Sequence, residues 1–458
     1  MEHAKENKMG TAAVLPLIIS MSVPAMISML VQAMYNVVDS IFVAQVSESA
    51  LTAVSLASPV QNLIIAFSVG SGVGVNSVVA RRLGERDQKA ADSAATHGLV
   101  MSLLLSIPFI LFGLFGSDAF GAAFASTEST AQQCADYLRI VMVMSGFVFV
   151  QVACEKILQS TGNMIWPMVM QMVGAVANII LDPIFIFGWF GLPAMGVTGA
   201  AIATVIGQML GCGVGLFALF FRNHMVKIRL KGFRFDWMTI RSIYSVGIPS
   251  MVMQGIGSVM TMFMNGVLGG FSETAVAVFG VYFKVQSFVF MPVFGLNSGV
   301  APIMGYNFGA RNRKRVMEAL KWQLCIAVGI MTLGTLLLQC MPDKLLLLFD
   351  ASENMLSIGV RAFRTISLCF IPAALGISFS TLFQAVGKGV NSMVISMVRQ
   401  LVVLVPSAFI LARVGGLDAT WYSFPLAEVF ALVLAIVFFV LLKRNVLDKI
   451  DAPVQHFE

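Results

Sequence analysis

The stretch Gln32-Ala-Met-Tyr-Asn-Val-Val-Asp39 lies within an apolar run that extends from about residue 14 to residue 46. A run of this length predicts a membrane-spanning helix, because about 20 apolar residues cross the hydrocarbon core. An ionised carboxylate costs roughly 2.5–3.5 kcal/mol at the centre of such a helix. Gln32, Tyr35 and Asp39 are three and four residues apart and therefore share one helix face. Asp39 is consequently a candidate functional residue that faces protein or water rather than lipid.

A second apolar run contains Asn178-Ile-Ile-Leu-Asp-Pro183, in which Asn178 and Asp182 also share a helix face. The two acids predict a polar pocket between two membrane helices that can hold a cation or a proton. The alternative is a structural role, in which hydrogen-bonded acids merely hold the two helices together.

Composition places the whole chain in a membrane. Of its 458 residues, 58% are hydrophobic and 11% are charged, whereas a soluble domain carries about 25% charged residues. The length of the apolar runs favours helices over the short strands of a membrane barrel. We therefore expect an all-α integral membrane protein with twelve transmembrane helices, near residues 14–46, 51–80, 93–115, 133–158, 164–187, 197–221, 242–268, 275–305, 319–341, 358–385, 390–412 and 421–442.

Basic residues gather in alternate loops, and cytoplasmic loops collect Lys and Arg. The net charge of +6 therefore indicates topology rather than nucleic-acid binding. We expect a multi-pass protein of the plasma membrane with both termini in the cytoplasm. The loops on the terminal side hold Arg81, Arg82, Arg86, Lys89, Arg222, Lys227, Arg229, Lys231, Arg234, Arg241, Arg311, Arg313, Lys314, Arg315 and Lys321, and the opposite loops hold little beyond Lys344 and Arg413.

The chain also repeats itself at an offset of 225 residues. An even number of helices per half gives both halves the same orientation, as in transporters built from parallel repeats that alternate their access. We expect two pseudo-symmetric six-helix bundles, with a first lobe at 1–221, a basic cytoplasmic linker at 222–241 and a second lobe with a short tail at 242–458. Matching pairs include Pro24 and Pro249, Gln61 and Gln286, Gly70 and Gly295, Gly74 and Gly299, Arg139 and Arg364, and Gly162 and Gly387.

Two prolines lie in the helices that carry the acids. Pro24 removes a hydrogen bond to the Ser20 carbonyl, and Pro183 removes one to the Ile179 carbonyl. They are candidate conformational hinges, although prolines in membrane helices are also static kinks.

Further charged residues fall within predicted spans. Glu155, followed by Lys156, either snorkels to the interface or supplies negative charge to a cavity for a cationic substrate. Lys284 is expected to face a central cavity, because it lies nearer the middle of its span. Arg399 and Glu428 are expected to pair with each other.

Motifs for soluble chemistry are absent from the sequence. There is no GxxxxGK[ST], HExxH, GxSxG or GxGxxG, and the four histidines have no metal-ligand spacing. The six cysteines lie mostly within spans and form no CxxC pair. We therefore expect that the protein is not an enzyme, uses no cofactor and binds no metal other than a possible Na⁺.

Six short motifs together resemble the multidrug and toxic compound extrusion (MATE) family over nearly the whole chain. They are Gln32 to Asp39, Val79-Ala-Arg-Arg-Leu-Gly84, Leu158-Gln-Ser-Thr-Gly162, Asn178 to Pro183, Gly199-Ala-Ala-Ile-Ala-Thr204 and Gly305-Tyr-Asn-Phe-Gly-Ala310. The run Glu155-Lys-Ile-Leu-Gln-Ser-Thr-Gly162 is most similar to the MepA-like branch.

The resemblance implies an antiporter that expels amphipathic, usually cationic drugs in exchange for H⁺ or Na⁺. It implies an ion or proton site at Asp39, Asn178, Asp182 and Thr204, with Tyr35 and Gln32 beside it, and a first helix that bends at Pro24. The NorM-like branch carries an acid in helix seven where this chain has Gln254, which puts a second ion site in doubt.

We therefore predict a monomeric exporter of organic cations by alternating access, with Gln32, Tyr35, Glu155, Gln254 and Lys284 as candidate substrate contacts. The alternative on the same scaffold is a flippase or exporter of a lipid-linked or anionic metabolite, for which Lys284 and Arg399 could bind anionic groups. A channel and a membrane enzyme are more distant alternatives.

Overall fold

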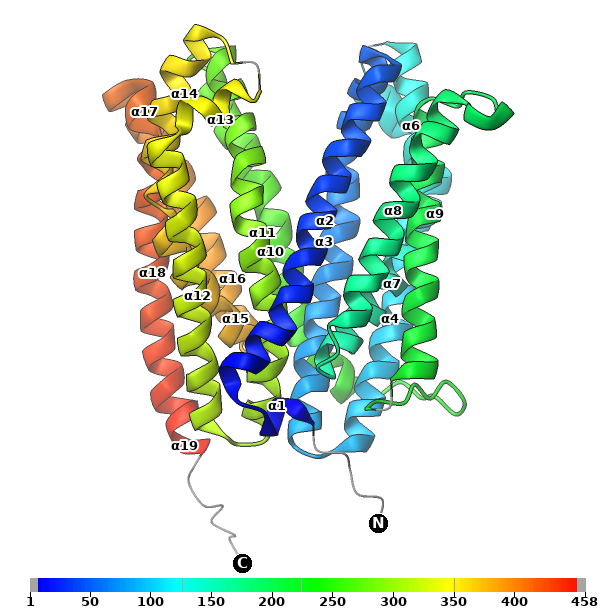
Figure 1. Ribbon diagram of the computed structural model, residues 1–458, viewed down its shortest axis with the longest axis vertical. Helices are drawn as coiled ribbons and strands as arrows, with labels where there is room; N and C mark the ends of the chain where they lie inside the picture. Colours follow the sequence, from blue (N-terminus) through cyan, green and yellow to red (C-terminus); the bar gives the residue numbers. More distant parts are fainter. Residues whose placement is uncertain (1–6, 126, 224, 350, 451–458) are drawn as a thin grey trace, which may run out of the picture. The chain divides into compact units, whose positions relative to one another are not determined.

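A computed structural model describes residues 7–125, 127–223, 225–349 and 351–450, and all regular elements within these ranges are helices (Figure 1). Helices satisfy every backbone hydrogen bond internally, as a bilayer requires. The longer helices are α2 (Val14–Val46), α3 (Glu48–Gly84), α4 (Gln88–Phe115), α6 (Glu128–Val143), α7 (Ser145–Ser160), α8 (Ile165–Phe187), α9 (Val197–Phe217), α10 (Trp237–Gly269), α11 (Glu273–Gly309), α12 (Arg313–Cys340), α14 (Glu353–Ser367), α15 (Phe370–Ala385), α16 (Gly389–Met397), α17 (Val405–Thr420) and α18 (Ser423–Leu442). Shorter elements are α1 (Lys8–Thr11), α5 (Ser117–Phe124), η1 (Trp189–Gly191), η2 (Ala218–Arg222), α13 (Pro342–Leu347), η3 (Val398–Leu404), η4 (Lys443–Leu447) and α19 (Asp448–Ile450).

The number of possible membrane spans agrees with the sequence. Among the described residues, ten helices are long and apolar enough to cross a bilayer, and two bent helix pairs bring the number to twelve if each pair is one span. The predicted all-α fold with twelve spans is thus confirmed.

The two bent spans were expected to be continuous helices. Each pair, α6 with α7 and α14 with α15, bends by 45°. The first bend lies at Met144, directly before Ser145 and Gly146, a Gly/Ser pair of the kind that kinks helices. The second lies before Pro372, which removes a hydrogen bond to the Leu368 carbonyl.

Helix bounds repeat along the chain at the predicted offset of 225 residues. Glu48–Gly84 corresponds to Glu273–Gly309, and Gln88–Phe115 corresponds to Arg313–Cys340. The turns that join these helices also match, because Arg86 and Arg311 both have a positive φ, of 61° and 56°. The predicted repeat is therefore a repeat of structure as well as of sequence.

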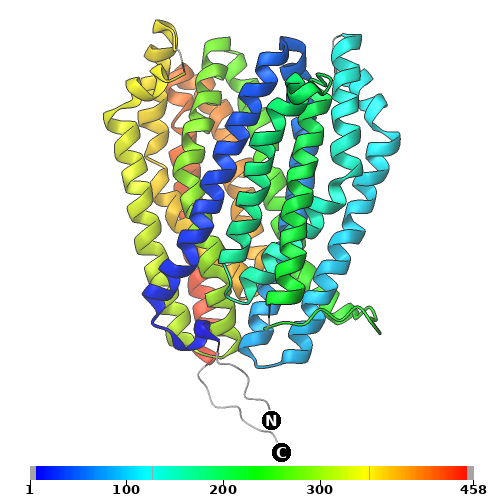
Figure 2. The ribbon, with the colours of Figure 1, turned by 45° about the vertical axis from the view of Figure 1, so that its right-hand side comes forward.

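The chain forms two compact units, taken over their described residues. The N-unit comprises Ile27–Leu83 and Asp87–Met251, and the C-unit comprises Met1–Met26, Gly84–Arg86 and Val252–Glu458. Helices run side by side within each unit (Figures 1 and 2). The predicted lobes assigned the start of α2 to the first lobe and the start of α10 to the second. In the structure, by contrast, α2 changes unit after Met26 and α10 changes unit after Met251, again 225 residues apart.

Duplicated glycines explain this exchange of helix beginnings. Within the N-unit, a Cβ at Gly70 would lie 2.5 Å from the backbone nitrogen of Met251. Within the C-unit, a Cβ at Gly295 would lie 2.6 Å from the Cα of Met26. Only glycine permits this backbone approach, so α3 holds the beginning of α10 and α11 holds the beginning of α2.

Candidate functional site

Two acids from different helices meet inside the N-unit. Asp39 on α2 and Asp182 on α8 place their carboxyl groups next to each other, close enough to share a proton. Asp182 is fully buried, and the Oδ1 atom of Asp39 is buried without a hydrogen-bond partner. A carboxylate only accepts hydrogen bonds, so a bond between two carboxyl groups requires a proton on one of them. The pair therefore has the composition of a site that binds a single proton.

Three uncharged polar residues hold the acids in place. With its amide oriented to satisfy both atoms, Asn178 donates to Asp182 Oδ2 at 2.8 Å and accepts from the Thr204 backbone N–H at 3.1 Å. The Tyr35 hydroxyl lies beside the Thr204 side chain. Because Tyr35 and Asp39 are one turn apart on α2, these contacts close a ring through α2, α8 and α9.

Helix geometry explains why these residues converge. Asn178 and Asp182 are four residues apart and occupy one face of α8, where both are at most 2% exposed. Close packing of α8 against α9 is permitted by Gly174 and Gly207, since a Cβ at Gly207 would lie 2.7 Å from the Gly174 carbonyl oxygen. The oxygens of Asp39, Asn178 and Thr204 are also of the type that hard cations prefer, so the same residues fit Na⁺.

Tyr137 and Gln61 are neighbours of this site that the sequence did not single out. Gln61 donates from its side-chain amide to the Tyr137 hydroxyl at 2.9 Å. The buried Tyr137 on α6 interacts electrostatically with Asp39, Tyr35 and Asp182. A tyrosine near a helix end commonly marks the membrane interface, so its sequence position carries little signal.

Glu155 lies in a separate buried cluster of the N-unit. Lys156 Nζ donates to Glu155 Oε1 at 3.1 Å and to Gln159 Oε1 at 3.0 Å, while the Gln159 amide donates to Glu155 Oε1 at 2.8 Å. The side chains of Glu155 and Lys156 are 8% and 9% exposed. The pair therefore packs inside the unit and does not snorkel to the interface.

The remaining predicted residues lie apart from the ring of contacts. Gln32 is half-buried on α2, and Gln254 is exposed on α10 in the C-unit. Lys284 is exposed on α11, with Nζ 5.8 Å from the centre of the Phe349 ring. Pro24 lies two residues before the point where α2 changes unit, and Pro183 is buried directly after Asp182 in α8.

The C-unit departs from the repeat where the N-unit has its acids. Met264 and Ser407 occupy the positions equivalent to Asp39 and Asp182. The π-helix η3 occupies the positions that are equivalent, in the repeat, to a regular part of α8. Its Arg399 donates to Glu428 Oε1 at 3.0 Å. The predicted pairing of Arg399 with Glu428 is confirmed, and this half presents a neutralised ion pair instead of two acids.

Comparisons with known proteins agree with this architecture. The MatE family model matches residues 24–184 and 249–410, so its two copies begin at Pro24 and Pro249. The multidrug export protein MepA of Staphylococcus haemolyticus is 25% identical over 93% of this chain and 94% of its own length.

Two solved structures cover nearly the entire chain. An outward-facing multidrug resistance MATE transporter of the MOP superfamily has a TM-score of 0.92 at 27% identity, over 98% of this chain and 100% of its own. A MOP superfamily transporter from Pyrococcus furiosus, described as having a binding pocket of reverse polarity that suggests a different function, has a TM-score of 0.90 at 27% identity, over 99% and 100%. Since the family model covers most of the sequence in two copies, the chain belongs to the MatE family and is a multi-pass membrane transporter of the multidrug export type.

Proposed function

We propose that this protein is an antiporter of the plasma membrane that exports amphipathic organic cations in exchange for protons. The single observation that carries the choice of proton is the close approach of the Asp39 and Asp182 carboxyl groups. Two carboxylates this close repel each other, and a proton on one relieves that repulsion. The site can therefore gain or lose one proton without rearranging its neighbours.

The energetics permit a stoichiometry of one proton. One proton entering for one monovalent cation leaving moves no net charge, so the pH gradient drives this exchange, and one pH unit corresponds to about 1.4 kcal/mol, or a tenfold concentration ratio. In the proposed cycle, proton uptake at the Asp39–Asp182 pair lowers the negative charge of the N-unit site and weakens its hold on a cationic drug facing outward. Release of the proton to the cytoplasm restores the negative charge and favours drug uptake there.

Conformational coupling is proposed to run through α2. Asp39 and Pro24 lie on this helix, on opposite sides of the point where it changes unit. A bend at Pro24 would move residues 27–46 relative to residues 14–26, and with them Tyr35 and Asp39. Pro183 is the corresponding candidate hinge beside Asp182.

Substrate contacts are proposed at Gln32, Tyr35, Gln254 and Lys284. Glu155 contributes little net charge to the binding of a cationic substrate, because Lys156 neutralises its carboxylate. The flippase alternative loses support for a related reason, since Glu428 neutralises one of the two cations on which it depended. We propose a monomer with both termini in the cytoplasm and with no organic cofactor.

Transport by the purified full chain in proteoliposomes tests this function. An imposed pH gradient should drive uptake of a fluorescent cationic dye, and a Na⁺ gradient alone should not. The matched control is Asp118→Asn, which removes a surface acid paired with Arg139 and should transport normally. Dye transport driven by Na⁺ but not by H⁺ would replace the proposed coupling ion, and transport of an anionic lipid in place of dye would favour the flippase.

A further inference from the structure

A basic segment joins the two repeats and belongs to the N-unit. It comprises the described residues 222–223 and 225–241, between η2 and the first turns of α10. In Figures 1 and 2 it leaves the end of α9 and runs sideways from the helices. All six of its basic side chains are exposed, namely Arg222, Lys227, Arg229, Lys231, Arg234 and Arg241.

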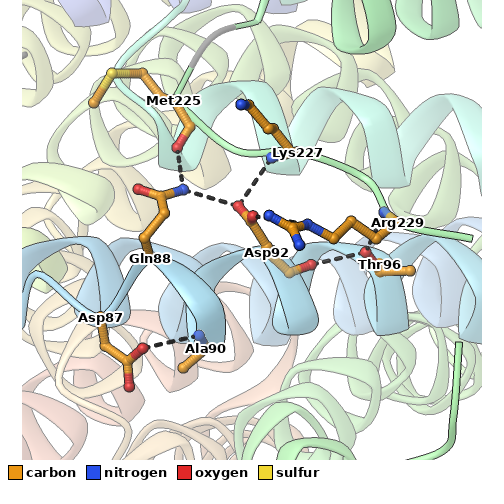
Figure 3. A network of polar contacts seen from close by, with 8 residues as sticks. All are labelled: Asp87, Gln88, Ala90, Asp92, Thr96, Met225, Lys227 and Arg229. Carbon is orange, nitrogen blue, oxygen red and sulfur yellow. Dashed lines mark hydrogen bonds and ion pairs between the residues drawn. The ribbon is translucent and has the colours of Figure 1, made fainter. Parts of the chain in front are cut away.

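Backbone groups attach this segment to α4. The Lys227 N–H donates to Asp92 Oδ1 at 2.9 Å, and the Arg229 N–H donates to Thr96 Oγ1 at 3.1 Å (Figure 3). The spacing of the donors along the segment matches the spacing of the acceptors along α4, because two extended residues and four helical residues both advance about 6–7 Å. Gln88 adds a hydrogen bond to the Met225 carbonyl at 2.8 Å.

His97 provides a second anchor farther along α4. Its Nδ1 bonds the Ser93 carbonyl at 2.8 Å, which leaves Nε2 to accept from the Asp236 N–H at 2.9 Å. The Phe233 ring packs 4.8 Å from the imidazole, centre to centre. The segment is thus held at both ends by a buried face of α4.

This mode of attachment leaves the basic side chains available. Alternation along the extended backbone places Val226 toward the protein and Lys227 on the other side. Lys227 points away from α4 in Figure 3, and Arg229 makes one ion pair, with Asp92 at 3.6 Å, while its side chain stays 71% exposed.

The segment's only acid, Asp236, is engaged elsewhere. Hydrogen bonds from the Thr239 hydroxyl and from the Met238 and Thr239 backbone N–H groups lower the pKa of Asp236, so it stays ionised at the start of α10. Its charge stabilises the beginning of that helix and is not paired with any of the six basic side chains.

Large apolar side chains flank the basic ones. Phe221 is 71% exposed, Phe235 60%, Trp237 75% and Met238 73%. They lie at the ends of the spans α9 and α10, where aromatic side chains mark the boundary between hydrocarbon and headgroups. Exposed aromatic residues beside exposed basic residues form a surface complementary to an anionic bilayer interface.

We propose that the basic segment is a docking surface for the headgroups of anionic phospholipids in the leaflet that surrounds the ends of α9 and α10. Lys227, Arg229, Lys231 and Arg234 contact the phosphates, while Phe235 and Trp237 insert beside the acyl chains. The side chains of Asp92, Thr96 and His97 set the register of the segment and thereby the spacing of the charges.

Quenching of Trp237 by brominated lipids tests the proposal in the full chain. The protein is reconstituted into phosphatidylcholine vesicles with a fixed fraction of brominated phosphatidylglycerol or of brominated phosphatidylcholine. Subtracting the signal of the Trp237→Phe variant isolates this residue from the other tryptophans. Enrichment of anionic lipid near several basic residues should make brominated phosphatidylglycerol quench Trp237 about threefold more efficiently than brominated phosphatidylcholine.

A charge-neutral variant and a charge-conserving control complete the design. The preference should disappear in Lys227→Gln/Arg229→Gln/Lys231→Gln/Arg234→Gln and persist in Lys227→Arg/Lys231→Arg. In the unmodified protein it should also weaken in 1 M NaCl, where the Debye length falls to about 3 Å. Equal quenching by both lipids in the unmodified protein would overturn the proposal, as would protection of Trp237 by an RNA or an acidic peptide without any lipid preference.

Discussion

Asp39 and Asp182 bring their carboxyl groups together between α2 and α8, where a proton on one lets it donate a hydrogen bond to the other. An asparagine at either position can still donate a hydrogen bond to the remaining carboxylate, so the helices should stay packed. It cannot exchange the shared proton. We therefore expect Asp39→Asn and Asp182→Asn each to reduce proton-driven dye transport to the level of empty vesicles, with normal yield in the membrane.

The double variant gives a sharper test of a shared proton. If the two acids act as one unit, Asp39→Asn/Asp182→Asn should be no worse than either single variant, because residues of one network are not additive. Transport rates from proteoliposomes measure this. Appreciable proton-driven transport by either single variant would show that the acids act separately.

Tyr35 and Thr204 should modulate transport without being indispensable. Tyr35→Phe and Thr204→Val each remove one hydroxyl of the polar contact between α2 and α9 but leave both acids. An ordinary hydrogen bond contributes about 0.5–1.5 kcal/mol, so we expect rates roughly two- to tenfold lower. Tyr422→Phe, at a tyrosine that is 55% exposed, is the control and should not change the rate. A complete loss in Tyr35→Phe would mean that the hydroxyl itself carries the proton.

The sequence predicts the membrane fold and the repeat because both depend on local composition and on identities at a fixed offset. It also places Asp39 and Asp182 in spans, since a charge in an apolar run is conspicuous. The contact between them depends on how α2 and α8 pack, which no local pattern encodes. Thr204 was reached only through the family resemblance, because a threonine in a membrane helix is unremarkable by itself.

Tertiary packing also decides the features that the sequence did not predict. The beginnings of α2 and α10 change unit because Gly70 and Gly295 contact a partner backbone. The sequence showed that the two glycines are a repeated pair, but it did not show which backbone each one contacts. The bend at Met144 depends on competing packing of the two halves of the span, because Ser145 and Gly146 permit a kink without requiring one. Tyr137 joins the site through a fourth helix, α6, whose position only the folded protein defines.

The close approach at Gly295 predicts a stability difference between two glycines. Gly295→Ala would place a methyl group 2.6 Å from the Met26 Cα, and overpacking of this kind costs about 1–3 kcal/mol. At Gly329 on α12, an added Cβ would have nothing within 4 Å, so Gly329→Ala should be neutral or slightly stabilising. Thermal unfolding in detergent should show a lower midpoint for Gly295→Ala only. Equal midpoints would contradict the tight contact between α11 and the beginning of α2.

Removing one partner of the Arg399–Glu428 ion pair should destabilise the protein more than replacing both partners with apolar residues. Their side chains are 24% and 14% exposed, and the Arg399 Nε atom has no partner. Glu428→Gln leaves a largely buried cation without its counter-charge, which costs about 3 kcal/mol. Arg399→Met/Glu428→Met removes both charges and keeps similar volumes, so its stability should return close to that of the unmodified protein.

Thermal unfolding and dye transport together distinguish a structural from a functional role for this pair. A purely structural pair predicts that the double methionine variant unfolds at a nearly normal temperature and transports dye at a nearly normal rate. A stable double variant with impaired transport would instead assign the pair a part in the transport cycle, and the π-helix η3 that carries Arg399 would be the element to examine. Greater destabilisation of the double variant than of Glu428→Gln would contradict the electrostatic argument, because it would show that the pair is net favourable even against a well-packed apolar core.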